Sequence, residues 1–368
     1  MPYFINEFWT SRQRQAHRLH EISYRACFKA QLPRFFIDRL TKQGDIVYDP
    51  FMGRGTTLLE AALLERIPYG NDINPLSRAL VEPRLKPPTL EQIKQRLESI
   101  PWDAFTQHAR EDLLVFYHPE TLAQLEGLRN WLIEKQKAET WDSIDAWIRM
   151  VAINRLTGHS SGFFSVYTLP PNQAVTVERQ RRINEKPNQK PDYRDVARII
   201  LRKSKNLLSQ GAPRCESFAT FTSQSWSTPA IADDTVALTV TSPPFLDIVD
   251  YESDNWLRCW FLGADPKSVP ISRHGKVPDW QRFIAKTLTE LARITKPGGF
   301  IAFEVGEVRN GSIQLEQNVI AAAEGLPLKT IGVMINQQEF TKTSNCWGVS
   351  NNKSGTNSNR IIILEKER

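Results

Sequence analysis

The apolar positions of the chain follow two periods, one typical of strands and one typical of helices. Short apolar runs indicate strands at six places along the 368 residues: 45–48, 68–74, 235–240, 300–305, 328–336 and 359–365. Apolar residues spaced as on one face of a helix occupy 57–67 and 279–295. Strand, turn, helix and strand in succession form a βαβ unit. We therefore predict an α/β fold with a doubly wound, Rossmann-like sheet that ends in a C-terminal antiparallel hairpin.

The middle of the chain has a different character. Four segments between 87 and 215 carry helical periodicity: 89–100, 119–137, 142–158 and 192–208. Breaks rich in proline, such as Leu169-Pro-Pro-Asn172, separate them. We expect three parts: residues 1–86, a mainly helical insertion at 87–215, and residues 216–368. In the last part, Lys296-Pro-Gly-Gly299 is expected to form a turn before the strand at 300–305.

Composition adds a few limits. Hydrophobic residues make up 40% of the chain, enough for a sizeable core, and the net charge of +6 is compatible with a polyanionic partner. The cysteines are widely spaced and form no CxxC pair, so we expect reduced, buried thiols, no disulfide framework and no metal site. No apolar run approaches the roughly 20 residues of a membrane span. The N-terminus has no apolar signal core, so a cytoplasmic protein without membrane association is expected.

The first segment with chemical content is Asp49-Pro-Phe-Met-Gly-Arg-Gly-Thr-Thr57, where a strand leads into a helix. Gly53 and Gly55 allow a sharp turn and a close approach of the backbone to a ligand. Asp72 stands at the end of the next strand, where a carboxylate can accept hydrogen bonds from both ribose hydroxyls of a nucleoside. A phosphate-binding P-loop fits poorly, because no lysine precedes the threonine. A tight turn without a ligand is the alternative interpretation.

The second segment is Thr241-Ser-Pro-Pro-Phe245, at the carboxyl end of an apolar strand. Two prolines fix the backbone and remove two N–H donors, so nearby carbonyl groups face the cleft without partners in the sheet. Methylation of cytosine at C5 needs a cysteine nucleophile after a proline. No cysteine of this chain follows a proline, so this chemistry is excluded.

Together the two segments resemble motifs I, II and IV of the S-adenosylmethionine-dependent DNA amino-methyltransferases. The segment His20–Ile37, with Phe28 and Lys29, resembles their motif X, which closes over the methionine end of the cofactor. The resemblance implies a methyltransferase sheet in which 1–86 binds the cofactor and 216–368 carries catalysis. It assigns the cofactor to nine residues: Phe28, Asp49, Pro50, Phe51, Gly53, Gly55, Thr56, Thr57 and Asp72. It assigns the target amine to Ser242, Pro243, Pro244 and Phe245.

The resemblance also explains the residue types of the second segment. An exocyclic amine is a poor nucleophile, because its lone pair is delocalised into the ring. Ser242 and the carbonyl of Pro243 can accept hydrogen bonds from the amine and aim its nitrogen at the methyl group. Phe245 can stack on a base flipped out of the duplex. Trp347 is expected either to help hold this base or to lie in the core. The Ser form is typical of cytosine-N4 enzymes and favours N4 of cytosine, with N6 of adenine as the alternative.

The segment 179–205 holds ten Lys and Arg against three acids, a net charge of +7. It predicts duplex DNA as the partner, contacted by Arg179, Arg181, Arg182, Lys186 and Lys190. Asn184, Asn188 and Gln189 are expected to pair with bases or phosphates. The order of motifs resembles enzymes whose inserted region, here 87–215, recognises the target. A cognate restriction endonuclease is a further expected partner. Open alternatives are a solvated helix face, an RNA substrate, or an inactive DNA-binding protein of the same fold.

Overall fold

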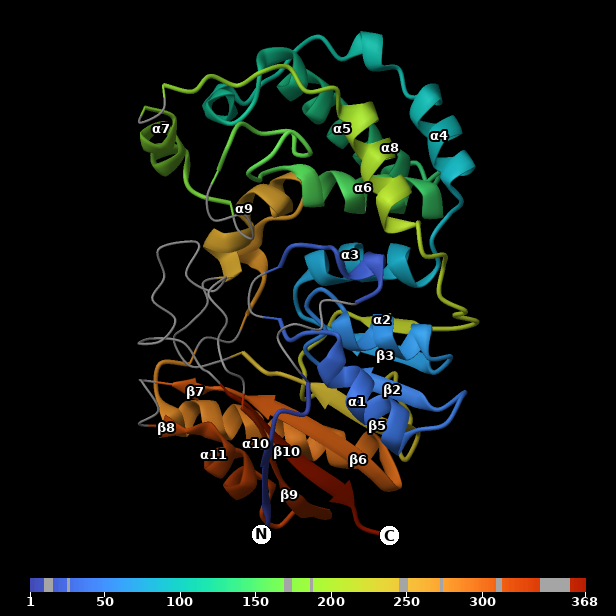
Figure 1. Ribbon diagram of the computed structural model, residues 1–368, viewed down its shortest axis with the longest axis vertical. Helices are drawn as coiled ribbons and strands as arrows, with labels where there is room; N and C mark the ends of the chain where they lie inside the picture. The colour runs from blue at the N-terminus through green and yellow to red at the C-terminus, as the bar shows by residue number, and fades with distance from the viewer. Residues whose placement is uncertain are drawn as a thin grey trace.

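The structure is a computed structural model that describes these stretches of the chain: 1–9, 16–24, 27–168, 174–185, 188–244, 251–271, 274–308, 313–337 and 358–368. It has a sheet with helices on both faces and a helical part beside it (Figure 1). The sheet strands are β1 (Tyr3–Asn6), β2 (Ile46–Asp49), β3 (Ile67–Asn71), β4 (Ala219–Phe221), β5 (Val236–Thr241), β6 (Thr295–Val305), β9 (Leu328–Gln337) and β10 (Ser358–Lys366). A separate pair is formed by β7 (Glu307–Val308) and β8 (Ile313–Gln314).

The eight-stranded sheet has the order β1-β9-β10-β6-β5-β2-β3-β4. Strands β4, β3, β2, β5 and β6 run parallel to one another. From β2 the chain moves outward through β3 to β4, and from β5 it moves outward on the other side through β6. The winding therefore reverses between β2 and β5, which is the switch point of a doubly wound sheet. The predicted fold class is confirmed.

The predicted C-terminal hairpin is also present. β10 pairs antiparallel with both β9 and β6, so it is inserted between them. The predicted turn at Lys296–Gly299 is wrong in one respect, because these residues lie within β6. They form an irregularity there: Val236 pairs with Thr295, but Leu238 pairs with Phe300. Gly298 has φ +73°, which glycine adopts without strain and which lets the strand absorb the extra residues.

Helices cover both faces of the sheet. One face packs against α1 (Gln31–Leu40) and α2 (Thr56–Leu63), and the other against α10 (Val277–Ile294) and α11 (Leu315–Ala323). Successive strand residues alternate between the two cores, as the period of two requires: Val47 lies in the core beneath α1 and Tyr48 in the core beneath α10. This double burial explains why the strands read as continuous apolar runs.

The inserted region is helical, as expected. Its helices are α4 (Leu90–Ser99), α5 (Pro119–Lys137), α6 (Ser143–Arg155), α7 (Val177–Glu185) and α8 (Val196–Leu207). They share one apolar core with α3 (Pro75–Leu85), which follows β3, and with α9 (Tyr251–Leu262), which follows the second motif. The division at 87 and 215 stays a prediction, since the packing on either side of it is continuous.

Three predicted helices are clearly shorter than expected, and the one predicted at 192–208 spans Val196–Leu207. The first ends at Leu63 instead of residue 67, because Glu65 adopts φ +61° and turns the chain into β3. The third inserted helix ends at Arg155 instead of residue 158. Among the described residues, no helix is long and apolar enough to cross a membrane, and no group of His, Cys, Asp and Glu could hold a metal ion.

Candidate active site

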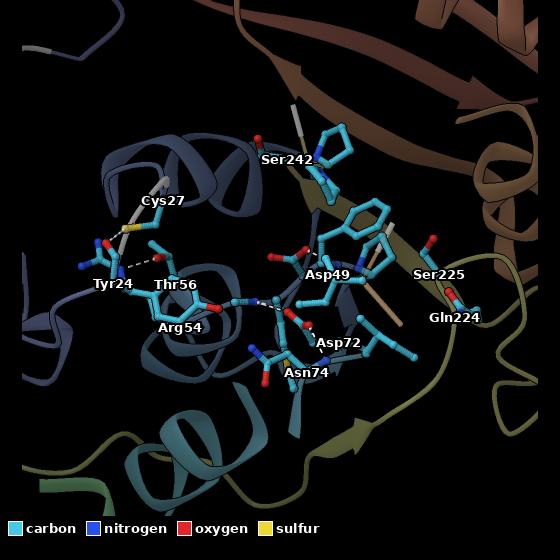
Figure 2. Close-up of a pocket in the computed structure, with 18 of the residues that line it drawn as sticks. Tyr24, Cys27, Asp49, Arg54, Thr56, Asp72, Asn74, Gln224, Ser225 and Ser242 are labelled. Carbon is cyan, nitrogen blue, oxygen red and sulfur yellow. Dashed lines mark hydrogen bonds between the residues drawn. The ribbon is translucent and has the colours of Figure 1, made fainter. Parts of the chain in front are cut away.

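Three neighbouring strands end at one cavity. β3, β2 and β5 are adjacent and parallel, so their carboxyl ends meet at the same edge of the sheet. Asp72 directly follows β3, Asp49 ends β2, and Ser242 directly follows β5. All three line the cavity, and Asp49 lies between Ser242 and Asp72 in the view of Figure 2. The cavity is thus at the switch point, where open α/β sheets bind their ligands.

Most residues predicted for the site line this cavity. They are Phe28, Asp49, Pro50, Phe51, Gly53, Thr56, Asp72, Ser242, Pro243 and Pro244. Phe245, Lys186 and Trp347 lie outside the described residues. Other lining residues were not predicted for the site, among them Tyr24, Cys27, Arg54, Asn74 and Ser225. Cys27 is exposed, contrary to the expectation of buried thiols, whereas Cys215 and Cys259 are buried.

Gly55 and Thr57 were predicted to contact the ligand, but neither is among the lining residues. Gly55 has φ +73°, and a Cβ on it would lie 2.5 Å from a methyl group of Val81. Its lack of a side chain therefore allows α2 and α3 to pack closely. Thr57 is buried, and its Oγ1 donates a hydrogen bond to the carbonyl of Val240 at 3.0 Å. Both residues therefore stabilise the turn through contacts on the side away from the cavity lining.

Asp72 organises the glycine turn. Its Oδ2 accepts the N–H of Gly53 at 2.9 Å, and its Oδ1 accepts the N–H of Asn74 at 2.9 Å. Asn74 caps α3 in turn, since its side chain accepts the N–H of Leu76 at 3.0 Å. Burial raises the pKa of Asp72 above its ordinary value, and the two N–H groups act in the opposite direction. The carboxylate is therefore fixed in place in the wall of the cavity.

Asp49 is the most buried acid of the site, with 2% of its surface exposed. Its Oδ1 accepts hydrogen bonds from the hydroxyl of Thr241 at 2.6 Å and from the N–H of Phe51 at 3.0 Å. Burial raises the pKa of Asp49 to about 7, against these hydrogen bonds, and the nearby Asp72 carboxylate raises it further. A cationic ligand in the cavity would favour its charged form.

Two residues distant in sequence hold the second motif. Trp280 of α10 has no exposed surface, and its indole N–H donates a hydrogen bond to the carbonyl of Pro244 at 2.9 Å. Glu304 of β6 is 5% exposed and shares a side-chain hydrogen bond with Ser242. Neither residue was assigned to the site from the sequence, although the segment 296–308, which contains Glu304, resembles a later strand motif of the same methyltransferases. The burial of a Trp and a Glu within apolar patterns is the other signal that could have drawn attention to them.

Arg54 ties the turn to the N-terminal segment. Its Nη1 donates to the carbonyl of Ile22 at 2.9 Å, and its Nε donates to Thr56 Oγ1 at 3.2 Å. Arg84 of α3 is fully buried and donates hydrogen bonds to the carbonyls of Arg54 and, at 3.0 Å, of Leu19. The two arginines thus connect the N-terminal wall of the cavity to the glycine turn.

Comparison with known proteins agrees with this arrangement. Residues 2–80, which contain the first motif, match the N6_N4_Mtase family, described as DNA methylase. The chain is 25% identical over 291 residues to the Type II methyltransferase M.BsoBI of Geobacillus stearothermophilus, a match that covers 70% of this chain and 55% of that protein. It is 30% identical over 150 residues to the Type II methyltransferase M.MvaI of Kocuria varians, covering 40% and 28%.

These matches support membership of the DNA amino-methyltransferase family, and the family match itself covers residues 2–80. The chain spans about half the length of M.BsoBI and less of M.MvaI. Among solved structures, an rRNA methylase of Streptococcus thermophilus aligns with 93% of this chain and 100% of its own at 8% identity and a TM-score of 0.36. A DNA modification methylase of Thermus thermophilus aligns with 38% and 51% at 19% identity and a TM-score of 0.24. These scores are low, and the fold assignment rests on the strand order.

The basic segment at 179–205 is divided between two helices. Arg179, Arg181 and Arg182 are exposed on α7. Figure 1 shows α7 on the side where β6 runs into β7, the side of the strands' carboxyl ends, whereas α8 lies toward α4. On α8, Lys203 forms an ion pair with Glu21 at 2.9 Å, so part of the positive charge is used inside the protein.

Two of the amides predicted to pair with bases or phosphates, Asn184 and Gln189, form hydrogen bonds within the protein instead. Asn184 Nδ2 donates a hydrogen bond to the carbonyl of Val115 at 2.8 Å. Gln189 Nε2 donates to the carbonyl of Tyr167 at 3.0 Å and to Asn184 Oδ1 at 2.8 Å. These bonds fix α7 on the helical part. The groups of this segment that remain accessible to a polyanion are therefore its exposed cations, which include the three arginines of α7 and Lys190. The amides of Asn184 and Gln189 are already hydrogen-bonded within the protein.

Proposed function

We propose that this protein is a DNA methyltransferase that uses S-adenosylmethionine to methylate N4 of a cytosine flipped out of the duplex. One observation carries the proposal. The Ser-Pro-Pro segment after β5 and the two acids at the ends of β2 and β3 line one cavity, although they are far apart in the sequence. A site for methylating a base needs a nucleoside-binding acid next to a group that orients an amine. Asp72 and Ser242 supply these two features.

The chemistry of the cavity fits the cofactor. The carboxylate of Asp72 is suited to the two ribose hydroxyls, and Asp49 supplies a negative charge for the cationic methionine end. Phe28, Phe51 and Ile73 offer apolar surface for the adenine ring. When bound, S-adenosylmethionine supplies an electrophilic methyl group. The part of the chain at 1–86 would hold it, in line with the predicted role of this segment.

The residues of the second motif act on the amine. Ser242 and the carbonyl of Pro243 accept hydrogen bonds from the two amine protons, which directs the nitrogen lone pair toward the methyl group. Trp280 holds the carbonyl of Pro244 and so fixes the orientation of the loop. Because the carbonyl of Pro244 is engaged in this way, the neighbouring carbonyl of Pro243 is the one that remains for the base.

We propose cytosine N4 over adenine N6 because the first residue of the motif is Ser242. A hydroxyl is a weaker acceptor than a carboxylate or an amide oxygen, and the Ser form resembles that of cytosine-N4 enzymes. Adenine N6 uses the same orienting geometry and is the second candidate. The family and relatives support amino-methylation of DNA at this coarser level.

DNA is the proposed substrate, with target recognition in the helical region 87–215. The exposed Arg179, Arg181 and Arg182 of α7 lie on the same side of the molecule as the carboxyl ends of the strands (Figure 1). A duplex that delivers a flipped base to Ser242 would therefore have phosphates near α7. The relatives bear the name Type II methyltransferase. We accordingly propose that a restriction endonuclease of the same specificity is a cellular partner.

The test is to incubate the purified protein with duplex DNA of mixed sequence and S-adenosylmethionine, and to analyse digested nucleosides by mass spectrometry. N4-methylcytosine is the expected product, and Ser242→Ala should lower its rate of formation strongly without abolishing it. N6-methyladenine alone would replace the cytosine assignment with adenine and keep the enzyme class. Methylation of RNA but not DNA, or cofactor binding without any methyl transfer, would overturn the proposal.

A further inference from the structure

A buried carboxylate stands next to Ser242 on the neighbouring strand. In the parallel register of β5 and β6, Thr241 pairs with Phe303, so Ser242 comes beside Glu304. The two side chains share a hydrogen bond. Asn359 Nδ2, at the start of β10, donates a second hydrogen bond to Glu304 Oε1 at 2.9 Å. Three adjacent strands therefore bring a hydroxyl, a carboxyl group and an amide together at the edge that holds the site.

The alternation of the strands places these three residues on one face of the sheet. Val240, Ala302 and Ile361 belong to the apolar core beneath α1. Residues two positions away along a strand point to the same face, which includes Ser242, Glu304 and Asn359. The carboxyl group is thus at the border between this core and the cavity. Burial raises the pKa of Glu304, while the hydrogen bonds with Ser242 and Asn359 act to lower it.

A buried acid in such surroundings costs folding energy unless it is paired. Glutamine at this position could accept from Asn359 with its oxygen and donate to Ser242 with its NH₂ group, so packing and polar satisfaction alone do not require a carboxyl group. What glutamate adds is the ability to take up a proton. Methylation of an amine produces such a proton, since the nitrogen becomes positively charged as its bond to the methyl carbon forms.

We infer that Glu304 receives, through the hydroxyl of Ser242, the proton that the base amine releases on methylation; this inference rests on the proposed function. The nitrogen–methyl bond forms as the methyl–sulfur bond breaks, and the charged nitrogen then transfers one proton to Ser242 Oγ. Ser242 passes its own hydroxyl proton to the Glu304 carboxylate. Ser242 ends neutral, Glu304 ends protonated, and the carboxyl group loses its proton to solvent before the next turnover.

The charged groups on the adjoining elements lie in separate contacts. Asp49 of β2 accepts the hydroxyl of Thr241, one residue before Ser242. Arg360 of β10, next to Asn359, forms an ion pair with Glu316 of α11. Since Glu304 accepts a proton only when ionised, the rate of the chemical step should fall as the pH falls through its pKa. Asp49 would affect cofactor affinity in the same direction, so the chemical step must be measured at saturating cofactor.

The experiment compares the wild type with Glu304→Gln in single-turnover methylation of duplex DNA across a range of pH. We expect Glu304→Gln to reduce the rate by roughly 10²-fold, the usual range for proton transfer by a positioned group, and to lose the acidic limb of the pH profile. Binding of the cofactor, measured by calorimetry, should be unchanged. Because Glu304 acts through Ser242, adding Glu304→Gln to Ser242→Ala should cause no further loss.

If Glu304→Gln folds poorly, two further measurements test the role of Glu304. Asn359→Ala removes one donor from the carboxylate, so the acidic limb should move to higher pH. Infrared titration of the protein without cofactor should show a protonated carboxyl band that is absent in Glu304→Gln and shifted in Asn359→Ala. An active wild type with an unchanged rate and pH profile in Glu304→Gln would overturn the role of Glu304 alone. A wild type that methylates no DNA would overturn the proposed function itself.

Discussion

The backbone N–H of Gly53 donates a hydrogen bond to Asp72 Oδ2 at 2.9 Å, and this bond joins the turn after β2 to the end of β3. The two residues were predicted separately, one for its conformational freedom and the other for its charge. Gly53 adopts φ +47°, which points its N–H toward the carboxylate. The acid therefore has two roles: it stabilises the turn and lines the cavity.

Asp72→Ala should weaken the binding of S-adenosylmethionine by about 1–3 kcal/mol, the usual loss for a hydrogen bond to a charged group. Asp72→Asn is the partial control, because its one amide oxygen can accept the N–H of either Gly53 or Asn74 while the charge and the second acceptor are gone. We expect an intermediate loss for this variant. Calorimetry on both folded variants provides the measurement, and wild-type affinity in Asp72→Ala would remove the residue from the cofactor site.

The buried carboxyl group of Asp49 should make the free energy of unfolding depend on pH. Its pKa is about 7 in the folded protein, above the ordinary value of 3.8. As the pH rises, the unfolded chain loses this proton first, so the folded state holds more protons between these two values. Stability should therefore decrease from about pH 4 to about pH 7, by on the order of 4 kcal/mol from this residue.

Asp49→Asn should remove that decrease, since the amide does not titrate. Thermal unfolding of the wild type and the variant, both without cofactor, should give curves that converge at low pH and separate toward neutral pH. Here the variant should be the more stable protein. Parallel curves at all pH values would show that the carboxyl group titrates near its ordinary value.

The sequence predicts those parts of the site that are encoded locally. Gly53 and Asp72 stand next to strand ends, and a strand followed by a turn can be recognised from a few consecutive residues. The meeting of these residues with Ser242 follows from one further rule, that parallel strands end at the same edge. The sheet and the cavity could therefore be predicted from short segments of the chain.

The remaining features depend on distant pairing. Trp280 reaches Pro244 from α10, and Glu304 reaches Ser242 only because β6 lies beside β5 in one particular register. No local pattern specifies such a partner. The short edge strand β4 carries no strong apolar alternation and was not predicted. Gly55 was predicted to contact the ligand, but its missing side chain instead allows a neighbouring helix to pack closely. Both requirements select glycine, so the sequence alone does not distinguish them.

Trp280→Phe tests whether the hydrogen bond to Pro244 matters for catalysis. Phenylalanine fills much of the buried volume but cannot donate to the carbonyl, so the loop loses one constraint worth about 0.5–1.5 kcal/mol. We expect the methyl-transfer rate to fall by a similar free energy, roughly 2- to 10-fold, with unchanged cofactor affinity. Loss of cofactor binding together with activity would instead indicate a general disturbance of the core, which a thermal unfolding curve would detect.

The arginines of α7 predict the salt dependence of DNA binding. Each phosphate that a side chain neutralises releases counterions, so the logarithm of the affinity falls linearly with the logarithm of the salt concentration. Replacing Arg181 and Arg182 with alanine should reduce that slope by about one for each lost contact. Both residues are exposed, and neither is among the described residues that line the cofactor cavity. Binding of S-adenosylmethionine should therefore be unaffected.

The matched control removes the same charge from α8. Arg198 and Lys205 are also exposed, but they lie on a helix that packs against α4, away from α7 (Figure 1). If the duplex contacts α7, their replacement with alanine should leave the salt slope nearly unchanged, although the net charge falls equally. Fluorescence anisotropy with labelled duplex at several salt concentrations distinguishes the two pairs. Equal changes for both would mean that overall charge, rather than contact with α7, governs binding, and an unchanged slope for α7 would make it a solvated helix face.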